Sequence, residues 1–574
     1  MHRSLYTPEI VSLIFYETLN GAEQWLNQLN SDTAQTLAGL ARTCKAFRDP
    51  ALDLLWKSQY TVMNILNCMP GDIWEVPDDT DAEEVRLKRP VLPSDWERPL
   101  IYSHRVRHFL YQSYSYPDNA AFYEMLRMCL PPEPLFPNIE SLCWETSDAA
   151  LFPHFRLFIG PRLTSLTIST FQSASHLSLL PALATQCPLL QNVRIMTSDG
   201  LPWRCETVSL FVKQLTRLES LEVPCLDAVA LDHLAKFPAL DFVHLDDQTP
   251  LSPILEPVPQ TEAPSSCDIN MLTLTVTDAR AVTEVLARLH ASPIWSLTIQ
   301  FPQNTSATAV REIYNGVAAN CKHASLSSLS ITAVPLVSTT DTAADLEQIA
   351  LYAVSGTHLF PLFTLTTLTS VTLAAPVGFD LDDAAAADIA RAWPRIRSLD
   401  LAGSLFVPPR TTLRALLTFA RLCPHLRWLC LPINAHSVPK WRKAQTAAEA
   451  RPTQRCLRSL YVGDSPVGTP LDVAAYLSSI FPKLKWVSGG KVDPRGEPVR
   501  AEVLAGRRKW KAVEAALPVL QKVDDVFVYL KRNLYPSVDV LQVVLGFDII
   551  LDDAADTFVL LSAFLTASSA LGER

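Results

Sequence analysis

The chain has 574 residues, a formal net charge of −10, and 43 prolines against 17 glycines. This length exceeds the roughly 100 to 200 residues of one domain, so we expect several domains or one repetitive solenoid. The acidic charge disfavours a nucleic-acid partner, because phosphate binding needs a basic surface. The scarcity of glycine, with no GxxxxGK[ST] or GxGxxG stretch, disfavours a nucleotide-binding loop.

Helix-start signals open the chain. The stretch 7–9, Thr-Pro-Glu, supplies an N-cap, a proline at the first helical position and an acid in the first turn. This combination predicts a helix from the proline onward. Ile10, Leu13 and Ile14 then recur at three- and four-residue spacing, with Phe15 and Leu19 widening the apolar stripe.

Two further short helices are predicted. Asp32 and Gln35 stand three residues apart, as in a capping box, and the helix behind them presents its apolar residues on one side: Leu37, Leu40, Ala41, Cys44 and Phe47. Asp49 and Pro50 repeat the cap-and-proline signal and predict the start of a third helix, whose apolar side is Leu52, Leu55 and Trp56. Three helices this short bury little surface, so an apolar face left for a partner is expected.

Cys44 has two interpretations, a reactive thiol or part of an apolar surface. It lies in helical register with Leu40 and Phe47, whereas a working thiolate needs partial exposure and a cationic setting. No histidine lies near it in this segment. We therefore expect Cys44 to contribute to packing or docking. The 12 cysteines of the chain form no CxxC pair or zinc-spaced cluster, so we expect buried thiols, no metal and no cofactor.

Several stretches of this segment carry a family resemblance: YTPEI at 6–10, IF at 14–15, LARTCKAF at 40–47, PAL at 50–52 and LW at 55–56. Together, over about residues 4–60, they resemble the F-box, in particular the F-box-like segment of fungal proteins. Tyr6-Thr7 replaces the usual Leu-Pro opening, and the connection 20–31 is longer than in the compact F-box.

The resemblance implies a small all-α plug that docks on the Skp-family adaptor of a cullin-RING ubiquitin ligase. Carried over by position, the docking residues are Pro8, Ile10, Ile14, Leu40, Cys44, Phe47 and Trp56. The alternative is that most of the same residues merely form a small core. We assign residues 1–66 to this domain, and residues 67–100 to an acidic, proline-containing surface linker with acids from Asp78 to Glu84. The acidic run is either simply solvated or a binding strip.

One pattern, L-x-x-L-x-L, recurs from residue 101 to 490. Strong copies, such as Leu163-Thr-Ser-Leu166-Thr-Ile168, begin at residues 163, 190, 218, 240, 326, 368, 396, 426 and 457. Weaker or partial copies begin at 106, 139, 269, 294 and 484. The pattern and its period are those of a leucine-rich repeat. It alternates apolar and polar residues at its end, as a strand with one buried face does.

Helical segments lie between these strands, among them 279–291, 384–393 and 412–423. Six of the intervening segments end in an apolar residue followed by proline, which stops a helix: Phe136, Cys187, Phe237, Trp393, Cys423 and Phe481. The predicted fold is therefore an irregular leucine-rich-repeat α/β solenoid, with parallel strands on one side and helices on the other.

The C-terminal part follows a different pattern. Residues 491–535 contain an amphipathic helix with Trp510, Val513 and Leu517 on its apolar side, which is expected to cap the last repeat. Residues 536–574 form a tail without an assigned structure. Its apolar stretch 557–571 is shorter than the roughly 20 residues of a membrane span. No signal peptide precedes Pro8, so we expect an intracellular protein, cytoplasmic or nuclear, without a membrane partner.

The functional hypothesis is a substrate-recognition subunit of an SCF-type ubiquitin ligase, in which the N-terminal helices bind the adaptor and the repeats bind a protein client. Strand positions on the concave side are the candidate client contacts: Thr167, Arg194, Glu222, His244, Asp400 and Cys430. The alternative is a leucine-rich-repeat scaffold without a ligase role. An enzyme is not expected, because no GxSxG, HExxH or Cys/His pair stands in a suitable context.

Overall fold

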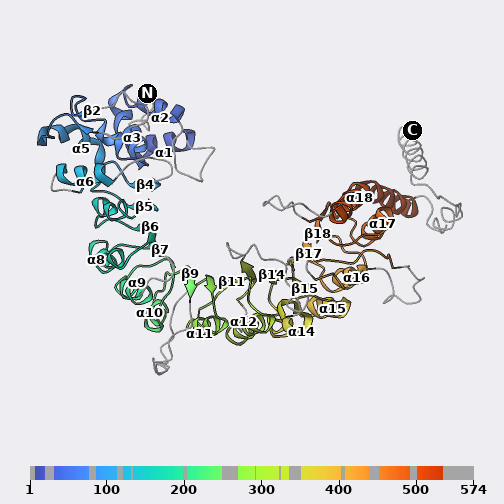
Figure 1. Cartoon of the computed structure of the whole chain (residues 1–574). Coiled ribbons are helices and arrows are strands. Elements are labelled where there is room, and N and C mark those ends of the chain that lie inside the picture. Colours follow the sequence, from blue (N-terminus) through green and yellow to red (C-terminus); the bar gives the residue numbers. More distant parts are fainter. Residues whose placement is uncertain are drawn as a thin grey trace, which may run out of the picture. The chain divides into compact units, whose positions relative to one another are not determined.

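The computed structural model describes residues 7–19, 31–75, 86–112, 120–130, 134–197, 203–248, 269–290, 292–321, 325–334, 351–401, 407–439, 452–490 and 501–533. The predictions for the acids 78–84 and for the tail 536–574 lie outside these residues. The chain divides into two compact units, Met1–Thr411 and Thr412–Arg574, and each is described by itself (Figure 1). No helix in the described ranges is long and apolar enough to cross a membrane.

Three helices form a small bundle at the start of the first unit: α1 (Pro8–Leu19), α2 (Ser31–Leu40) and α3 (Lys45–Trp56). The predicted start at Pro8 is confirmed. Their common core consists of Val11, Phe15, Leu37 and Ala51. Because this cluster of buried side chains is small, the bundle gains little stability from its own core.

The predicted boundary between the second and third helices is wrong. Helix α2 ends at Leu40, a turn follows, and Cys44 is the N-cap of α3 in extended backbone geometry (φ −156°, ψ 164°). Pro50 therefore lies inside α3 and does not start a helix. The continuous apolar spacing from Leu37 to Phe47 concealed the break, because a tight turn can preserve one face across two helices.

The bundle is joined directly to the sheet of the first unit. Helix α3 leads into β1 (Ser58–Gln59), which pairs in parallel with β4 (His108–Gln112). Trp56 stacks on Tyr102, with ring centroids 4.7 Å apart. Arg105 forms ion pairs with Asp49, at 2.7 Å, and with Asp53. A two-residue strand has too little pattern to be predicted from the sequence.

The described parts of the expected linker 67–100 are packed structure, and do not form a surface loop. The segment after β1 contains α4 (Met63–Leu66), the antiparallel pair β2 (Trp74–Glu75) and β3 (Arg86–Leu87), the 3-10 helix η2 (Pro93–Trp96) and α5 (Glu97–Ser103). Ile73 and Trp96 are 0% and 3% exposed. These isolated apolar residues belong to no periodic pattern, so their burial could not be predicted from the sequence.

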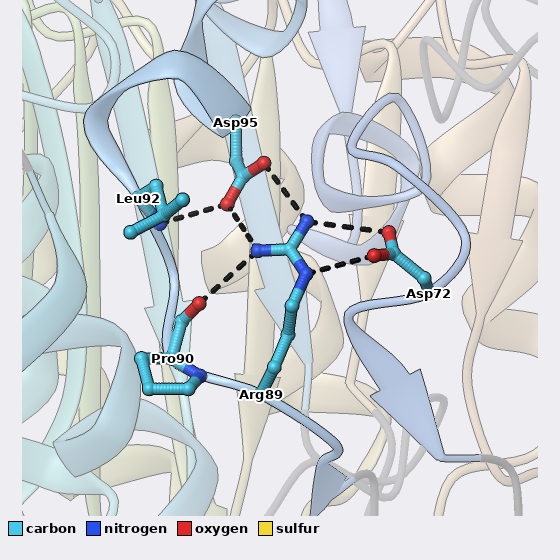
Figure 2. Close-up of polar contacts among 5 residues, drawn as sticks. All are labelled: Asp72, Arg89, Pro90, Leu92 and Asp95. Carbon is cyan, nitrogen blue, oxygen red and sulfur yellow. Dashed lines mark hydrogen bonds and ion pairs between the residues drawn. The ribbon is translucent and has the colours of Figure 1, made fainter.

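Arg89 joins the two ends of this segment (Figure 2). Its Nε lies 2.8 Å from Asp72 Oδ2, and its Nη1 lies 2.8 Å from Asp95 Oδ2 and donates to the Pro90 carbonyl. Asp95 also accepts the Leu92 N–H at 2.7 Å. The hydrogen bonds from Arg89 hold the pKa of both carboxyls below their usual range.

Every predicted repeat copy of the first unit forms a parallel strand. The sheet runs in the order β1-β4-β5-β6-β7-β8-β9-β10-β11-β12-β14-β16. The strands after β4 are β5 (Ser141–Glu145), β6 (Ser165–Phe171), β7 (Asn192–Thr197), β8 (Ser220–Val223), β9 (Phe242–Gln248), β10 (Met271–Val276), β11 (Ser296–Pro302), β12 (Ser328–Val334), β14 (Ser370–Ala374) and β16 (Ser398–Asp400). The pattern's apolar positions are buried, as Leu163, Leu166 and Ile168 at 0% exposure illustrate.

The intervening helices cover one face of this sheet (Figure 1). They are α6 (Ala120–Cys129), η3 (Phe152–Phe158), α7 (Ala174–Leu177), α8 (Leu180–Gln186), α9 (Arg204–Val212), α10 (Ala228–Leu234), α11 (Ala279–Arg288), α12 (Ala307–Asn320), α14 (Gly356–Leu359), η4 (Phe360–Thr364) and α15 (Asp383–Ala392). A small side sheet pairs β13 (Val354–Ser355) with β15 (Phe379–Asp380). The architecture is thus an α/β solenoid of the leucine-rich-repeat kind.

The proline stop signals are confirmed at four of the six predicted positions. Helices α8 and α15, and α16 and α17 of the second unit, each end one residue before an X-Pro pair, at Cys187, Trp393, Cys423 and Phe481. These four C-cap residues share φ near −120° and ψ near 70°, outside the helical region that a following proline disfavours. Helix α6 ends at Cys129, well before Phe136, and α10 ends at Leu234, before Phe237.

The second unit contains β17 (Trp428–Cys430), β18 (Ser459–Gly463) and β19 (Trp486–Gly489), paired in parallel. Its helices are α16 (Leu413–Leu422), α17 (Pro470–Ile480) and α18 (Ala501–Asn533). Helix α18 packs on α17 and β19. Trp510 and Leu517 of α18 are 1% and 0% exposed, so this helix covers apolar surface that no further repeat would otherwise bury.

We expect Trp510→Ala to destabilise the second unit by about 3–5 kcal/mol, the usual cost of removing a buried aromatic side chain. The indole Nε1 also donates to the Ser465 carbonyl at 2.8 Å, and this acceptor would lose its partner. Urea unfolding followed by circular dichroism measures the change. Leu504→Ala, on the same helix at a side chain 42% exposed, should cost well under 1 kcal/mol. Equal effects of the two variants would contradict the capping role.

Candidate functional site

The exposed face of α1 is apolar. Ile10, Leu13 and Ile14 are 40%, 59% and 42% exposed, whereas Val11 and Phe15 on the other face are 1% and 7% exposed. The helix therefore has two apolar faces, one of which packs against α2 and α3. An exposed row of aliphatic side chains on one helix is typical of a surface that a partner covers.

The structure separates the predicted docking residues into two groups. Pro8, Ile10 and Ile14 are exposed. Leu40 and Phe47 pack against the bundle core, and the Phe47 ring meets Phe15 edge-on at 5.3 Å. Cys44 is half-buried at the α3 N-cap, and the half-buried Trp56 packs on Tyr102.

Leu13 is exposed beside the predicted docking residues Ile10 and Ile14. The sequence predicted Leu13 only as part of the apolar stripe of this helix. Its exposure of 59% exceeds that of Ile10 and Ile14. The sequence could not distinguish the two apolar faces of α1, because both have helical spacing.

Four predicted client-contact residues lie side by side on the sheet of the first unit. Thr167 of β6 is opposite Arg194 of β7, Arg194 is opposite Glu222 of β8, and Glu222 is opposite His244 of β9. Strand alternation places all four on the face that is not covered by helices. They form one continuous row, which we call the charged row.

Glu222 is the centre of the charged row. Its Oε2 lies 3.2 Å from Arg194 Nε, and its Oε1 lies 3.2 Å from His244 Nδ1. The hydrogen bond with His244, together with the positive charge of Arg194, lowers the pKa of Glu222 despite partial burial. Asp246, which the sequence analysis did not select, lies 3.8 Å from His244 Nε2.

The row continues into a neutral region. Beyond His244, the facing positions on successive strands carry hydroxyl groups: Thr273, Thr298, Ser330 and Thr372. Asp400 of β16 ends this series, opposite Thr372. The charged row and Asp400 are therefore separated along the sheet, and a single small contact would not include both. Threonine and serine at these positions fit a strand surface without indicating function, so they gave no sequence signal.

Cys430 is not a surface contact. Its residue exposure is 3%, and β17 ends with it. The prediction assumed strict alternation along the strand, but both Leu429 and Cys430 are buried. Strict alternation is not kept here because the strand is only three residues long and Cys430 is its last residue.

The buried-thiol prediction is confirmed for five of the eleven described cysteines: Cys187, Cys225, Cys321, Cys423 and Cys430. The other six described cysteines are only half-buried. Burial raises the pKa of Cys187 and Cys423 to about 12, so both thiols remain protonated at neutral pH. No group of three or more potential metal ligands gathers within the described ranges.

We expect Glu222→Gln to lower stability by about 1 kcal/mol at pH 7, because the side chain loses its ion pair with Arg194 and the charge that strengthens its hydrogen bond with His244. A lowered folded-state pKa stabilises the protein above the unfolded value of about 4.3. This contribution is lost as the pH falls through the folded-state pKa. Urea midpoints should therefore differ at pH 7 and converge once the pH lies below the folded-state pKa of Glu222. Glu219→Gln, exposed on the same repeat, should show neither effect, and a pH-independent difference for Glu222→Gln would contradict this assignment.

Comparisons with known proteins add little to this picture. No family model and no curated protein matches the chain. Among solved structures, the chain is similar to the leucine-rich repeat-containing protein LegL7 from Legionella pneumophila, with 14% sequence identity and a TM-score of 0.26. The match covers 69% of this chain and 95% of that one. Because the identity and the TM-score are low, the description of the fold rests on the strand register and helices of this chain.

Proposed function

We propose that the protein is a substrate-recognition subunit of an SCF-type ubiquitin ligase. In this proposal the exposed face of α1 binds a Skp-family adaptor, and the uncovered sheet face of the repeats binds a protein client. In this proposal the chain itself makes or breaks no covalent bond. It raises the local concentration of client lysines near a ubiquitin-conjugating enzyme that carries activated ubiquitin. The protein then works in the cytoplasm or the nucleus.

The observation that carries the proposal is the exposure of Ile10, Leu13 and Ile14 on a helix whose other face already packs in a core. A helix that served only to cover the end of the sheet would gain nothing from a second apolar face. The F-box-like sequence pattern at the same residues supports an adaptor as the partner.

Co-expression with a fungal Skp adaptor and pull-down tests this proposal. We expect wild type to retain the adaptor and Ile10→Asp/Ile14→Asp to lose at least 90% of it, because two carboxylates would be desolvated in an apolar interface. Both side chains are exposed, so the variant should keep the circular dichroism spectrum and thermal midpoint of wild type.

Ile101→Asp is the matched control, because Ile101 is 56% exposed on α5, outside the proposed interface. It should retain the adaptor fully. Absence of retention by wild type, or equal retention by the Ile10/Ile14 variant, would rule out the adaptor role at this face.

A leucine-rich-repeat scaffold without a ligase role is the second candidate. It is favoured by the direct continuation of α3 into β1 and by the ion pairs of Arg105 with α3, since both tie the helices to the sheet end. Deleting residues 1–30 separates the two functions. The scaffold hypothesis expects loss of solenoid stability, whereas the receptor hypothesis expects a folded solenoid that no longer binds the adaptor.

A further inference from the structure

The charge of the chain is strongly uneven. Residues 1–411 contain 27 Lys or Arg and 44 Asp or Glu, a net charge of −17. Residues 412–533, which include every described part of the second unit, contain 21 Lys or Arg and 9 Asp or Glu, a net charge of +12. The second unit as a whole, residues 412–574, contains 22 Lys or Arg and 15 Asp or Glu, a net charge of +7. It is therefore a basic part of an acidic protein, which the whole-chain charge of −10 conceals.

Three of these basic residues form a ladder at the start of the strands of the second unit. The N–H groups of Arg458 and Ser459 donate to the Arg427 carbonyl, and those of Lys485 and Trp486 donate to the Arg458 carbonyl. Arg427, Arg458 and Lys485 thus occupy the same position in successive repeats, about 4.8 Å apart. All three are exposed. Among the residues that the structure describes, none of the three has a carboxylate partner.

The corresponding positions of the first unit are different in charge. They include Glu140, Glu219 and Asp241, and the basic Arg107 forms an ion pair with Glu140 at 3.2 Å. Arg397, before β16 of the first unit, is also basic and exposed. The charge at this position therefore differs from repeat to repeat and does not follow from the repeat itself.

Two exposed indoles lie directly beside this ladder. Trp428 and Trp486 are 42% and 64% exposed, and each follows a ladder residue in the chain. Both pair in register with Ser459 of the strand between them, so they lie two strand spacings, or about 10 Å, apart. We call Arg427, Arg458, Lys485, Trp428 and Trp486 the basic–aromatic face.

We propose that the basic–aromatic face binds single-stranded nucleic acid. Cationic side chains that follow a strand edge neutralise backbone phosphates, and exposed aromatic rings provide surfaces on which bases stack. The two features occur together here, at consecutive positions of adjacent repeats. An acidic peptide would use only the cationic side chains and would leave the two indoles exposed to water. An anionic bilayer would favour a continuous apolar patch, whereas a serine separates these indoles.

This inference does not depend on the adaptor proposal. It limits the expectation, made from the sequence, that the chain does not bind nucleic acid. That expectation used the charge of the whole chain. Salt screens charges beyond about 8–10 Å, so the local charge of the second unit governs contact with a phosphate backbone.

Fluorescence anisotropy with the full-length protein and a labelled 20-nucleotide single-stranded RNA of mixed sequence tests the inference. The same measurement with single-stranded DNA shows whether the sugar matters. We expect Arg427→Glu/Arg458→Glu/Lys485→Glu to weaken binding at least 10-fold. The slope of log K against log salt should fall by about 2, because each phosphate contact on a single strand contributes about 0.7.

The aromatic part of the face has a separate signature. Trp428→Ala/Trp486→Ala should weaken binding about 10-fold while leaving the salt slope unchanged, since stacking releases no counterions. Trp428→Phe/Trp486→Phe should recover much of the affinity. Both indoles are exposed, and thermal midpoints equal to wild type verify that the variants are folded.

The matched charge control is Arg508→Glu/Lys509→Glu/Lys511→Glu on α18, which changes the net charge by the same amount at exposed positions away from the ladder. It should weaken binding less than 3-fold. An equal loss in this control would show general electrostatic attraction and overturn a local site. Absence of RNA binding at 50 mM salt would overturn the inference. Displacement of RNA by polyglutamate at equal charge concentration would also overturn it, and so would binding of phosphatidylserine vesicles that depends on the two indoles.

Discussion

The structure depends on one constraint: each repeat must bury its row of apolar side chains against the next repeat. A single L-x-x-L-x-L strand, such as that with Leu166 and Ile168, cannot enclose its own apolar side chains; the neighbouring strand and the covering helix enclose them. Parallel pairing also satisfies the hydrogen-bonding groups of the strand backbone, because the N–H groups of each repeat donate to carbonyls of the preceding repeat. The alternate side chains take no part in this burial. They can vary in charge without affecting the fold, and the charged row, from Thr167 to His244, occupies these positions.

Such a stack has ends, and special segments cover them. At the start of the first unit, α3 continues into β1 and forms an ion pair with Arg105. Arg89 stabilises the segment that follows through its ion pairs with Asp72 and Asp95 (Figure 2). In the second unit, α18 inserts Trp510 against the last strand. The N-terminal bundle differs from a simple cover, because α1 keeps Ile10, Leu13 and Ile14 exposed after its own core is complete. This surplus apolar surface is the physical basis for proposing a partner.

Charge divides the molecule in a way that its total hides. On the sheet face of the first unit, Glu222 pairs with Arg194 and shares a hydrogen bond with His244, so its charge is compensated locally. In the second unit the ladder of Arg427, Arg458 and Lys485 lacks such partners among the described residues. Repeat proteins can carry surfaces of different charge, because each repeat contacts only its neighbouring repeats and can therefore vary its surface independently.

The sequence by itself determined the repeat, since apolar periodicity and proline stops report burial and helix ends directly; each predicted copy is a strand, and four X-Pro pairs end helices. It also placed Thr167, Arg194, Glu222 and His244 in one row. Tertiary structure decided the rest. Only packing showed which apolar face of α1 is exposed, that a turn separates Leu40 from α3, that Ile73 and Trp96 are buried, and that Cys430 faces inward. These features depend on contacts between segments distant in sequence, which a local pattern does not encode.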